Sequence, residues 1–351
     1  MIEFDKVGKR YGNLVAVDSL SFKVEEGQTT VLIGPSGCGK TTSLRMVNRM
    51  VEPSDGYVYV NGKPVKSFSA EQLRRGIGYV IQSIGLLPHM TVRDNITIVP
   101  KLLGWKREER YRRSEELLRL IGMDPEVYLY KHPAELSGGE AQRIGVARAL
   151  AADPPILLMD EPFGAVDPLN RENLQNEFIA LQKKLKKTVI FVTHDLDEAV
   201  KIADKIVLLR EGRLVQEDSP ERLLAAPKNN FVREFVGDDR ALKRLACFRV
   251  EDHMRPVRAA TVEAVSRGPA ANSEPPGRES TVKEEGAVGS ASSVSSVSSA
   301  YVGPHTSVRD ALSKILGRGL REIPVRDEDG RLLGNIFLED IEKLNQFSTD
   351  Q

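Results

Sequence analysis

Residues 34–42 read Gly34-Pro35-Ser36-Gly37-Cys38-Gly39-Lys40-Thr41-Thr42 and follow the apolar run Thr30-Val31-Leu32-Ile33. The stretch matches the pattern G-x-x-x-x-G-K-[ST] between a predicted buried strand and a predicted helix. Glycines let backbone N–H groups curl around phosphate oxygens, the Lys40 ammonium adds a point charge, and the Thr41 hydroxyl can ligate Mg²⁺. A chance glycine-rich turn is the alternative, but it requires neither the strand nor the Lys-Thr pair. The loop therefore predicts an α/β fold that binds nucleotide phosphates.

The composition is that of a folded globular protein, with 40% hydrophobic and 28% charged residues among 351. The 50 basic residues equal the 50 acidic ones, so no bulk positive field favours nucleic acid, and we expect no nucleic-acid partner. Two cysteines are too few for a disulfide framework. The start lacks a signal-peptide pattern, and the apolar runs are far shorter than the roughly 18 residues that cross a bilayer. Any membrane role is expected to come through a partner.

Sequence periodicity divides the chain into four segments. Over 1–235, continuous apolar runs alternate with helical patterns, which is typical of a parallel sheet buried on both faces. Residues 236–264 are predicted to be a connector, and the Ser-, Pro- and Gly-rich residues 265–303 a disordered linker. Residues 304–347 predict a small α/β unit, with a helical face, two strands around the turn Asp327–Gly330, and a last helix. Because roughly 45 residues make a small core, we expect this unit to pair with another copy or pack on the first.

Two further predicted strands end in residues with chemically active side chains. The apolar run 156–159 leads to Asp160 and Glu161, and ligands bind at the carboxyl ends of parallel strands. Asp160 suits a Mg²⁺ site, and Glu161 suits a general base that activates water. Ordinary solvated carboxylates are the alternative, which the phosphate loop disfavours. His194 follows the run Thr188–Thr193 and is expected to contact the γ-phosphate or Glu161, although a lone histidine is more often structural.

The stretch Leu136-Ser137-Gly138-Gly139-Glu140 has the S-x-x-E spacing of a helix capping box. Capping alone accounts for Ser137 and Glu140 but does not require the two glycines. A helix N-terminus with two glycines also presents backbone N–H groups and the positive end of the helix dipole to an anion. We therefore expect a second anion site at this helix.

Together these motifs resemble the ATP-binding cassette (ABC) family. The matches are Gly34–Thr41 to its Walker A loop, Gln82 to the Q-loop, 136–143 to the signature, 156–161 to the Walker B strand, His194 to the switch histidine, and Tyr11 to the aromatic residue that stacks on adenine. The resemblance covers residues 1 to about 235. It implies a P-loop NTPase nucleotide-binding domain of the ABC type with a helical subdomain. The departures are mild, with Glu140 for a frequent glutamine and Val166 for the usual D-loop leucine.

The resemblance also implies roles for these residues. Those expected to be catalytic are Glu161, His194, Gln82 and Lys40, and those expected to hold Mg²⁺ are Thr41, Gln82 and Asp160. Contacts to ATP are expected from Tyr11, residues Gly34 to Thr42, and Ser137, Gly138 and Gly139. In the family the signature of one copy completes the ATP site of the other, which implies a homodimer that encloses two ATP. Membrane permease subunits, an extracytoplasmic substrate-binding protein and a position at the cytoplasmic face of the inner membrane are implied as well.

Finer resemblances concern cargo and regulation. Residues 85–92 and 133–135 are similar to bacterial importers, and residues 98–105 and 159–164 to the quaternary-amine branch, which takes up glycine betaine, carnitine or choline as osmoprotectants. The last unit resembles a CBS domain, and residues 250–254 resemble the opening of a first copy whose remainder is missing. Asp340 matches a ribose-binding residue, whereas Phe337 stands where Thr or Ser is usual. Two roles for this unit stay open: a sensor of ionic strength, or a vestigial unit that only packs.

Other hypotheses are compatible with a phosphate loop. The chain could serve an importer for another small solute. A soluble ABC ATPase of translation or DNA repair usually carries two cassettes or a long coiled-coil insertion, and this chain has neither. A P-loop kinase would transfer the phosphoryl group to a small acceptor, which the signature disfavours. The position of Cys38 inside the loop leads us to expect that its alkylation blocks nucleotide binding.

Overall fold

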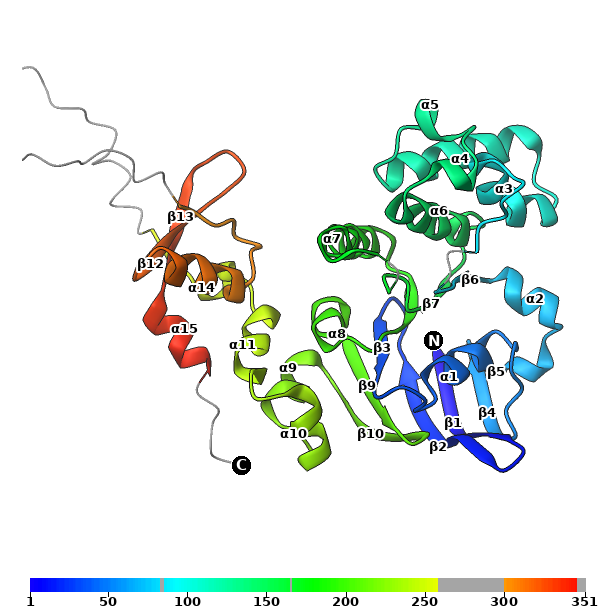
Figure 1. Cartoon of the computed structure of the whole chain (residues 1–351), viewed down its shortest axis with the longest axis horizontal. Helices are drawn as coiled ribbons and strands as arrows, with labels where there is room; N and C mark the ends of the chain where they lie inside the picture. Colours follow the sequence, from blue (N-terminus) through cyan, green and yellow to red (C-terminus); the bar gives the residue numbers. More distant parts are fainter. Residues whose placement is uncertain (83–84, 165, 258–299, 346–351) are drawn as a thin grey trace, which may run out of the picture. The chain divides into compact units, whose positions relative to one another are not determined.

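The computed structural model of the chain describes residues 1–82, 85–164, 166–257 and 300–345 (Figure 1). It contains two compact units, Met1–Lys243 and Arg244–Gln351, each with a hydrophobic core of its own. Within the described residues, every helix is too short or too polar to cross a bilayer.

The larger sheet of the first unit carries the phosphate loop. Its strand order is β10-β9-β3-β8-β7-β6, and all neighbours are parallel except the edge strand β10, which is antiparallel to β9. Every residue of β3, β7 and β8 is buried, which confirms the prediction of a parallel sheet covered on both faces. The bounds are β3 Thr29–Ile33, β6 Ile77–Val80, β7 Ile156–Asp160, β8 Thr188–Val192, β9 Lys205–Arg210 and β10 Arg213–Asp218.

A second sheet is antiparallel, with the order β2-β1-β4-β5. Helix α1 (Lys40–Val47) contacts strands of both sheets, and residues of α1 and the two sheets form one hydrophobic cluster. Phe4 and Phe22 stack within it, with ring centroids 4.4 Å apart. The phosphate loop is therefore anchored between two sheets. The bounds are β1 Ile2–Tyr11, β2 Leu14–Val24, β4 Asp55–Val60 and β5 Lys63–Pro64.

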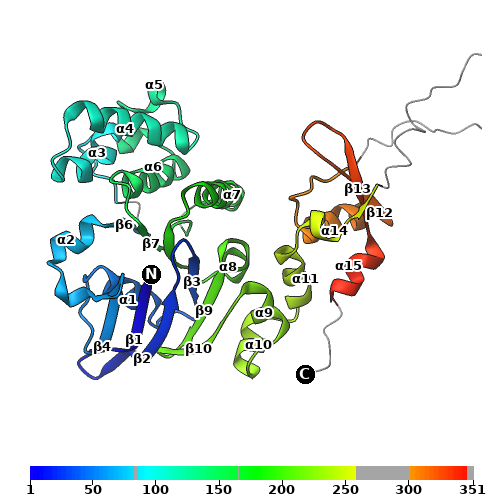
Figure 2. The ribbon, with the colours of Figure 1, turned by 180° about the vertical axis from the view of Figure 1, so that it is seen from behind.

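Helices α3 to α6 form a group beyond the β6 end of the large sheet in both views (Figures 1 and 2). Helix α3 packs on α4 and α6, and α6 packs on β6 of the large sheet. This group confirms the predicted helical subdomain. Its helices are α3 Val92–Leu102, α4 Arg107–Leu120, α5 Pro125–Tyr128, the 3₁₀ turn Pro133–Glu135 and α6 Gly138–Leu150. The other helices of the unit are α2 Ala70–Arg75, α7 Pro168–Leu185, α8 Leu196–Ile202, α9 Pro220–Ala225, α10 Asn230–Val236 and α11 Arg240–Arg244.

The second unit has a three-stranded antiparallel sheet of order β11-β13-β12 with helices α14 and α15. The predicted helical face is confirmed, since Val308 and Ile315 of α14 are fully buried. The two strands and the last helix also form where the pattern predicts them. The bounds are α12 Val250–His253, β11 Arg255–Pro256, α14 Val308–Gly317, β12 Glu322–Arg326, β13 Leu332–Phe337 and α15 Leu338–Asn345.

The predicted boundaries of this unit are wrong at both ends of the linker. Val302, assigned to the linker 265–303, is 1% exposed, and its N–H donates to the carbonyl of Pro324. Val250, assigned to the connector 236–264, is fully buried in the same cluster. Both supply apolar side chains that a core of roughly 45 residues lacks. Residues 250–254, which resemble the opening of a first CBS copy, thus complete this unit, and most of the predicted linker falls outside the described residues.

Candidate active site

The phosphate loop turns sharply between β3 and α1. Gly34, Gly37 and Gly39 have positive φ angles of 143°, 78° and 100°. A Cβ atom on Gly34 would lie 2.1 Å from the carbonyl oxygen of Leu209, and one on Gly39 would lie 2.5 Å from that of Ala16. The conformation and the close backbone approach therefore both require glycine at Gly34 and Gly39.

Lys40 begins α1 and folds back into the curl of the loop. Its Nζ donates to the carbonyl oxygen of Gly34 at 2.7 Å and to that of Pro35 at 3.1 Å, and the residue is only 7% exposed. Pro35, Ser36 and Gly37 form the exposed outer turn of the loop. The ammonium charge thus lies beside the N-terminus of α1, where backbone N–H groups and the helix dipole favour an anion.

Cys38 does not line the exposed part of the loop. It is 3% exposed and belongs to the hydrophobic cluster between the sheets. Burial raises the pKa of its thiol, although Lys40, whose Nζ is 3.9 Å from Sγ, opposes the shift. A buried thiol with a raised pKa reacts slowly, so we expect alkylation of Cys38 to be slow. That its alkylation blocks nucleotide binding stays a prediction.

Thr41 and Asp160 meet although 118 residues separate them in the chain. The Thr41 hydroxyl donates to Oδ1 of Asp160 at 2.8 Å, and a guanidinium nitrogen of Arg45 lies 3.7 Å from Oδ2. Burial raises the pKa of Asp160, while the Thr41 hydrogen bond and the charge of Arg45 lower it. A hydroxyl beside a carboxylate is a donor pair that suits Mg²⁺, which commonly takes one or two carboxylates together with phosphate oxygens and water. Thr42 follows, half-buried, in the first turn of α1.

Glu161 is the centre of a second group of side chains. Its Oε2 accepts a hydrogen bond from Nε2 of Gln82 at 3.1 Å and lies 3.3 Å from Nδ1 of His194. Adjacent parallel strands explain the meeting, because β6, β7 and β8 end side by side just before these three residues. Of the two contacts expected for His194, the structure shows the one to Glu161.

The backbone of Glu161 is unusual. Its φ angle is +46°, in the left-handed region that residues other than glycine rarely adopt, and its N–H donates to the carbonyl of Val192 at 2.9 Å. A backbone that turns out of β7 in this way directs two successive carboxylates, Asp160 and Glu161, to different neighbours. Strain of this kind persists where the surroundings hold it, and it is concentrated at functional sites.

Tyr11 ends β1 with its ring half exposed, at 47%. The ammonium of Lys9 lies 4.9 Å from the ring centroid. The phenol makes a small contribution to raising the pKa of Arg45, the residue beside Asp160. An exposed ring there is available for stacking on a planar base.

The signature residues line a different cavity, with a volume of about 400 Å³. Ser137, Gly138 and Gly139 lie on its wall together with Asp167 and Asn170 of the D-loop and α7. No residue of the phosphate loop contributes to this cavity. Within one chain, therefore, the structure does not bring the signature to the Walker A loop.

The predicted capping box is confirmed at the start of α6. Ser137 Oγ accepts from the N–H of Glu140 at 3.3 Å, and Oε2 of Glu140 accepts from the N–H of Ser137 at 2.7 Å. Tyr128, which the motifs did not point to, donates its hydroxyl to the other oxygen of Glu140 at 2.5 Å. This hydrogen bond lowers the pKa of Glu140, so the carboxylate that replaces the family's glutamine remains ionised.

The sequence motifs did not predict two side chains near these sites, namely Arg45 beside Asp160 and Tyr128 beside Glu140. Arg45 follows Lys40 by five residues on α1, so a helical projection from the loop could have placed it near the acidic strand end. No sequence signal joins Tyr128 to Glu140, because Tyr128 ends α5 and a 3₁₀ turn lies between that helix and α6.

Comparisons with known proteins agree with this geometry. The family model described as ABC transporter matches residues 17–164, and the CBS domain model matches 291–344. Among solved structures, the dimeric bacterial ABC transporter cassette MJ0796 superposes with a TM-score of 0.57 at 31% identity, over 63% of this chain and 99% of that one. A post-hydrolysis dimer of the same cassette, bound to ADP and Pi, gives a TM-score of 0.56 at 30% identity, with the same coverage of both chains.

Several characterised relatives are similar over most of the chain. The carnitine transport ATP-binding protein OpuCA of Listeria monocytogenes is 44% identical, over 95% of this chain and 89% of its own length. The glycine betaine/carnitine/choline transport ATP-binding protein OpuCA of Bacillus subtilis is also 44% identical, over 95% of this chain and 93% of its own. The osmoprotectant import ATP-binding protein OsmV of Salmonella typhimurium is 56% identical, over 68% of this chain and 63% of its own length. The chain therefore belongs to the ABC transporter family, as an ATP-hydrolysing subunit that carries a CBS domain after its cassette.

Proposed function

We propose that the chain powers the uptake of a quaternary-amine osmoprotectant, namely glycine betaine, carnitine or choline. The observation that carries this proposal is the similarity to the two OpuCA proteins, which extends beyond the cassette over 95% of the chain. Cassettes of many transporters share the Walker motifs, whereas a cassette followed by a CBS region of this kind is a narrower match. The cargo itself does not touch this chain, so the proposal rests on the relatives.

ATP would be held by the Walker A loop and Tyr11, with Mg²⁺ held by Thr41 and Asp160. When bound, the metal supplies charge that stabilises the phosphate oxygens in the transition state. The donor pair fits this ion, since the hydroxyl and the carboxylate already converge at 2.8 Å. Among the described residues no group of three His, Cys, Asp or Glu side chains could hold a metal. Such a limited donor set accords with a metal that takes its other ligands from phosphates and water.

Hydrolysis would depend on Glu161 as general base. Its Oε2 is held by Gln82 and lies beside His194, which would leave Oε1 to accept a proton from the attacking water. Lys40 would neutralise charge on the phosphates, and His194 would contact the γ-phosphate. Gln82 already donates a hydrogen bond to Glu161. A shift of Gln82 when metal or nucleotide binds would therefore move the carboxylate of the general base.

A second copy of the chain would complete each ATP site. The motivating observation is that Ser137, Gly138 and Gly139 line a cavity separate from the Walker A loop of the same chain. The N–H groups of Gly138 and Gly139 and the positive end of the α6 dipole are suited to the γ-phosphate held by a partner. ATP would thus join two copies head to tail, with two nucleotides enclosed.

The dimer would act at the cytoplasmic face of the inner membrane, peripherally, on permease subunits that receive cargo from an extracytoplasmic substrate-binding protein. Neutral overall charge and the α/β fold give no reason to add nucleic acid as a partner.

Uptake measurements test the cargo. Cells that lack this chain should lose uptake of radiolabelled glycine betaine, carnitine or choline under osmotic stress, and the unaltered chain should restore it. The Glu161→Gln chain should restore none of it, although the protein is made. Normal uptake of all three compounds in the deleted strain would overturn the osmoprotectant proposal and favour an importer for another solute.

A further inference from the structure

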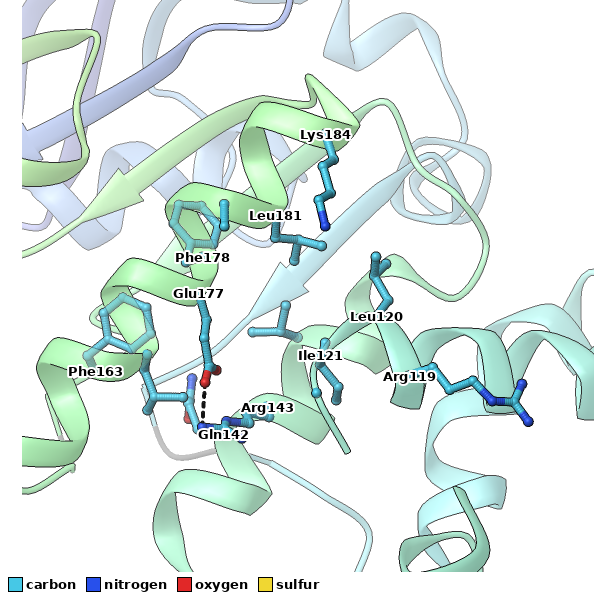
Figure 3. A pocket seen from close by; sticks show the side chains of 14 residues that line it. Arg119, Leu120, Ile121, Gln142, Arg143, Phe163, Glu177, Phe178, Leu181 and Lys184 are labelled. Atoms are coloured by element: carbon cyan, nitrogen blue, oxygen red, sulfur yellow. Dashed lines mark hydrogen bonds and ion pairs between the residues drawn. The ribbon is translucent and has the colours of Figure 1, made fainter. Parts of the chain in front are cut away.

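A second cavity of the first unit has no part in the ATP site described above. It lies between the end of α4, helix α6, Phe163 and helix α7, and its volume is about 250 Å³ (Figure 3). Helices α4 and α6 belong to the helical subdomain, whereas Phe163 follows the Walker B strand by three residues and α7 follows the D-loop. The cavity therefore spans the junction between the helical subdomain and the catalytic strands.

The interior of the cavity is apolar. Phe163, Phe178 and Leu181 line one side, and Leu120 and Ile121 lie across from them (Figure 3). The rings of Phe163 and Phe178 pack against Phe191 of β8, with centroids 5.8 and 6.1 Å from it. This wall is therefore continuous with the buried core beside β8.

The charged and polar groups of the cavity favour an anion. Arg143 and Glu177 neutralise each other at 2.7 Å, and Arg119 points away from the cavity. Lys184 is exposed, and it has no ion-pair or hydrogen-bond partner among the residues that the structure describes. Its ammonium extends toward the cavity (Figure 3), so the mouth carries an unneutralised positive charge.

A second and independent observation concerns Gln142, which also lines the cavity. This side chain is 2% exposed, and its Nε2 finds no hydrogen-bond acceptor among the described residues. A buried amide donor without an acceptor is costly and uncommon in folded proteins. A ligand oxygen at this wall would provide the acceptor.

From these features we propose that the cavity binds an apolar carboxylate that bears a second oxygen acceptor, such as a medium-chain hydroxy acid. The carboxylate pairs with Lys184, the hydrocarbon chain packs on Phe178, Leu181 and Ile121, and the second oxygen accepts from Gln142. This site goes beyond the proposed transport function, because neither the nucleotide nor the cargo occupies it.

The cavity and the signature cavity share lining residues, so a ligand in one can affect the other. Gly122, Arg143 and Leu174 line both this cavity and the one that contains Ser137 to Gly139. A ligand wedged between α6 and α7 fixes the spacing of two helices that begin at the signature and at the D-loop. We therefore expect the ligand to slow ATP turnover by restricting closure of the two copies over ATP.

Calorimetric titration of the full chain with 10-hydroxydecanoate tests the site. We expect one molecule per chain, at least ten-fold weaker binding after Lys184→Glu, and unchanged binding after the matched control Lys183→Glu, which alters the neighbouring exposed lysine outside the cavity. Decanoate, which lacks the second oxygen, should bind to the unaltered chain more weakly than 10-hydroxydecanoate does. The Gln142→Leu chain should bind the two acids with equal affinity. ATPase activity should fall with 10-hydroxydecanoate in the unaltered chain but not in Lys184→Glu.

Three results would overturn the proposal. They are no measurable binding of 10-hydroxydecanoate, equal effects of Lys184→Glu and Lys183→Glu, and equal affinity of the unaltered chain for the two acids. The titration uses the isolated protein without membrane partners, so its outcome is independent of the uptake experiment that tests the cargo.

Discussion

Gln82 donates a hydrogen bond from Nε2 to Oε2 of Glu161 across 3.1 Å. The two residues follow neighbouring parallel strands, and the loop that begins at Gln82 leads into the helical subdomain. Movement of that subdomain would therefore change the position of the carboxylate proposed as general base. This contact gives the structure a direct connection between a region that a membrane partner could move and the step that breaks the phosphate bond.

Loss of the base should stop hydrolysis without loss of nucleotide binding. We expect Glu161→Gln to lower kcat by about a hundred-fold or more, with KM for ATP little changed, because an amide cannot accept the proton of water. The variant should also remain dimeric with ATP in size-exclusion chromatography. Glu172→Gln, at an exposed carboxylate of α7, is the matched control and should keep the normal rate. A kcat of Glu161→Gln within two-fold of normal would instead favour phosphoryl transfer to another acceptor.

A mixing experiment tests whether the signature acts in trans. Lys40→Ala removes the phosphate-binding charge and Ser137→Arg blocks the signature cavity, so each variant alone should be inactive. In a heterodimer of the two, one site combines the intact Walker A loop of one copy with the intact signature of the other. Random pairing then gives roughly a quarter of normal activity if the two sites work independently.

The mixture has a built-in control. Lys40→Ala mixed with Lys40→Ala,Ser137→Arg leaves no intact site in any dimer and should stay inactive. Failure of the first mixture to exceed the second, at concentrations where ATP-bound heterodimers are seen by cross-linking, would contradict completion in trans.

The buried position of Cys38 predicts slow chemistry at this thiol. In Cys247→Ser, which leaves Cys38 as the remaining thiol, labelling by N-ethylmaleimide at pH 7.5 should be at least ten-fold slower than in the guanidinium-unfolded chain. Burial both blocks the reagent and raises the pKa, which lowers the thiolate fraction. Mass spectrometry gives the rate. Rapid labelling that ATP suppresses would contradict this prediction and show that the thiol is accessible in the loop.

The sequence was most informative where the backbone alone determines the structure. Continuous apolar runs predicted the buried strands β3, β7 and β8, and the glycines predicted the curled Walker A loop, where a Cβ atom on Gly34 or Gly39 would clash with the backbone. Adjacent parallel strands then placed His194 beside Glu161, one of the two contacts predicted for it, whereas the hydrogen bond from Gln82 to Glu161 was not predicted.

Contacts between distant elements could not be predicted in the same way. Nothing near Val302 in the sequence shows that it pairs with β12, because a short apolar residue at the end of a serine-rich stretch has no periodic neighbours. The Tyr128–Glu140 hydrogen bond and the cavity beside α7 likewise depend on how helices pack, which local patterns leave open.

The second unit contains an ion cluster that should make its stability depend on salt and pH. Arg255 of β11 donates to both oxygens of Asp340 at 2.7 and 2.9 Å, pairs with Glu339, and lies over the ring of Phe337, 4.3 Å from its centroid. Asp340 is the residue that matches a ribose-binding position, and here its carboxylate is engaged by an arginine of the same unit. The cluster joins β11 to α15, and we expect Arg255→Ala to lower the Tm of this unit.

The pH and salt dependence follow from the charges. Arg255 lowers the pKa of Asp340, so the stabilisation is complete above the unfolded pKa of about 3.9 and is lost as the pH falls through the lower folded value. The difference in Tm between the unaltered chain and Arg255→Ala should thus be constant from pH 6 to 8 and shrink below about pH 4. It should also shrink in high salt, since exposed ion pairs are screened. Scanning calorimetry with ATP identifies the transition, because we expect ATP to raise the Tm of the first unit, which holds the Walker A loop. Arg331→Ala, at an exposed arginine of the turn before β13, is the control and should change neither profile. A Tm difference that persists unchanged at pH 3 would show that Arg255 stabilises the unit by packing on Phe337 instead.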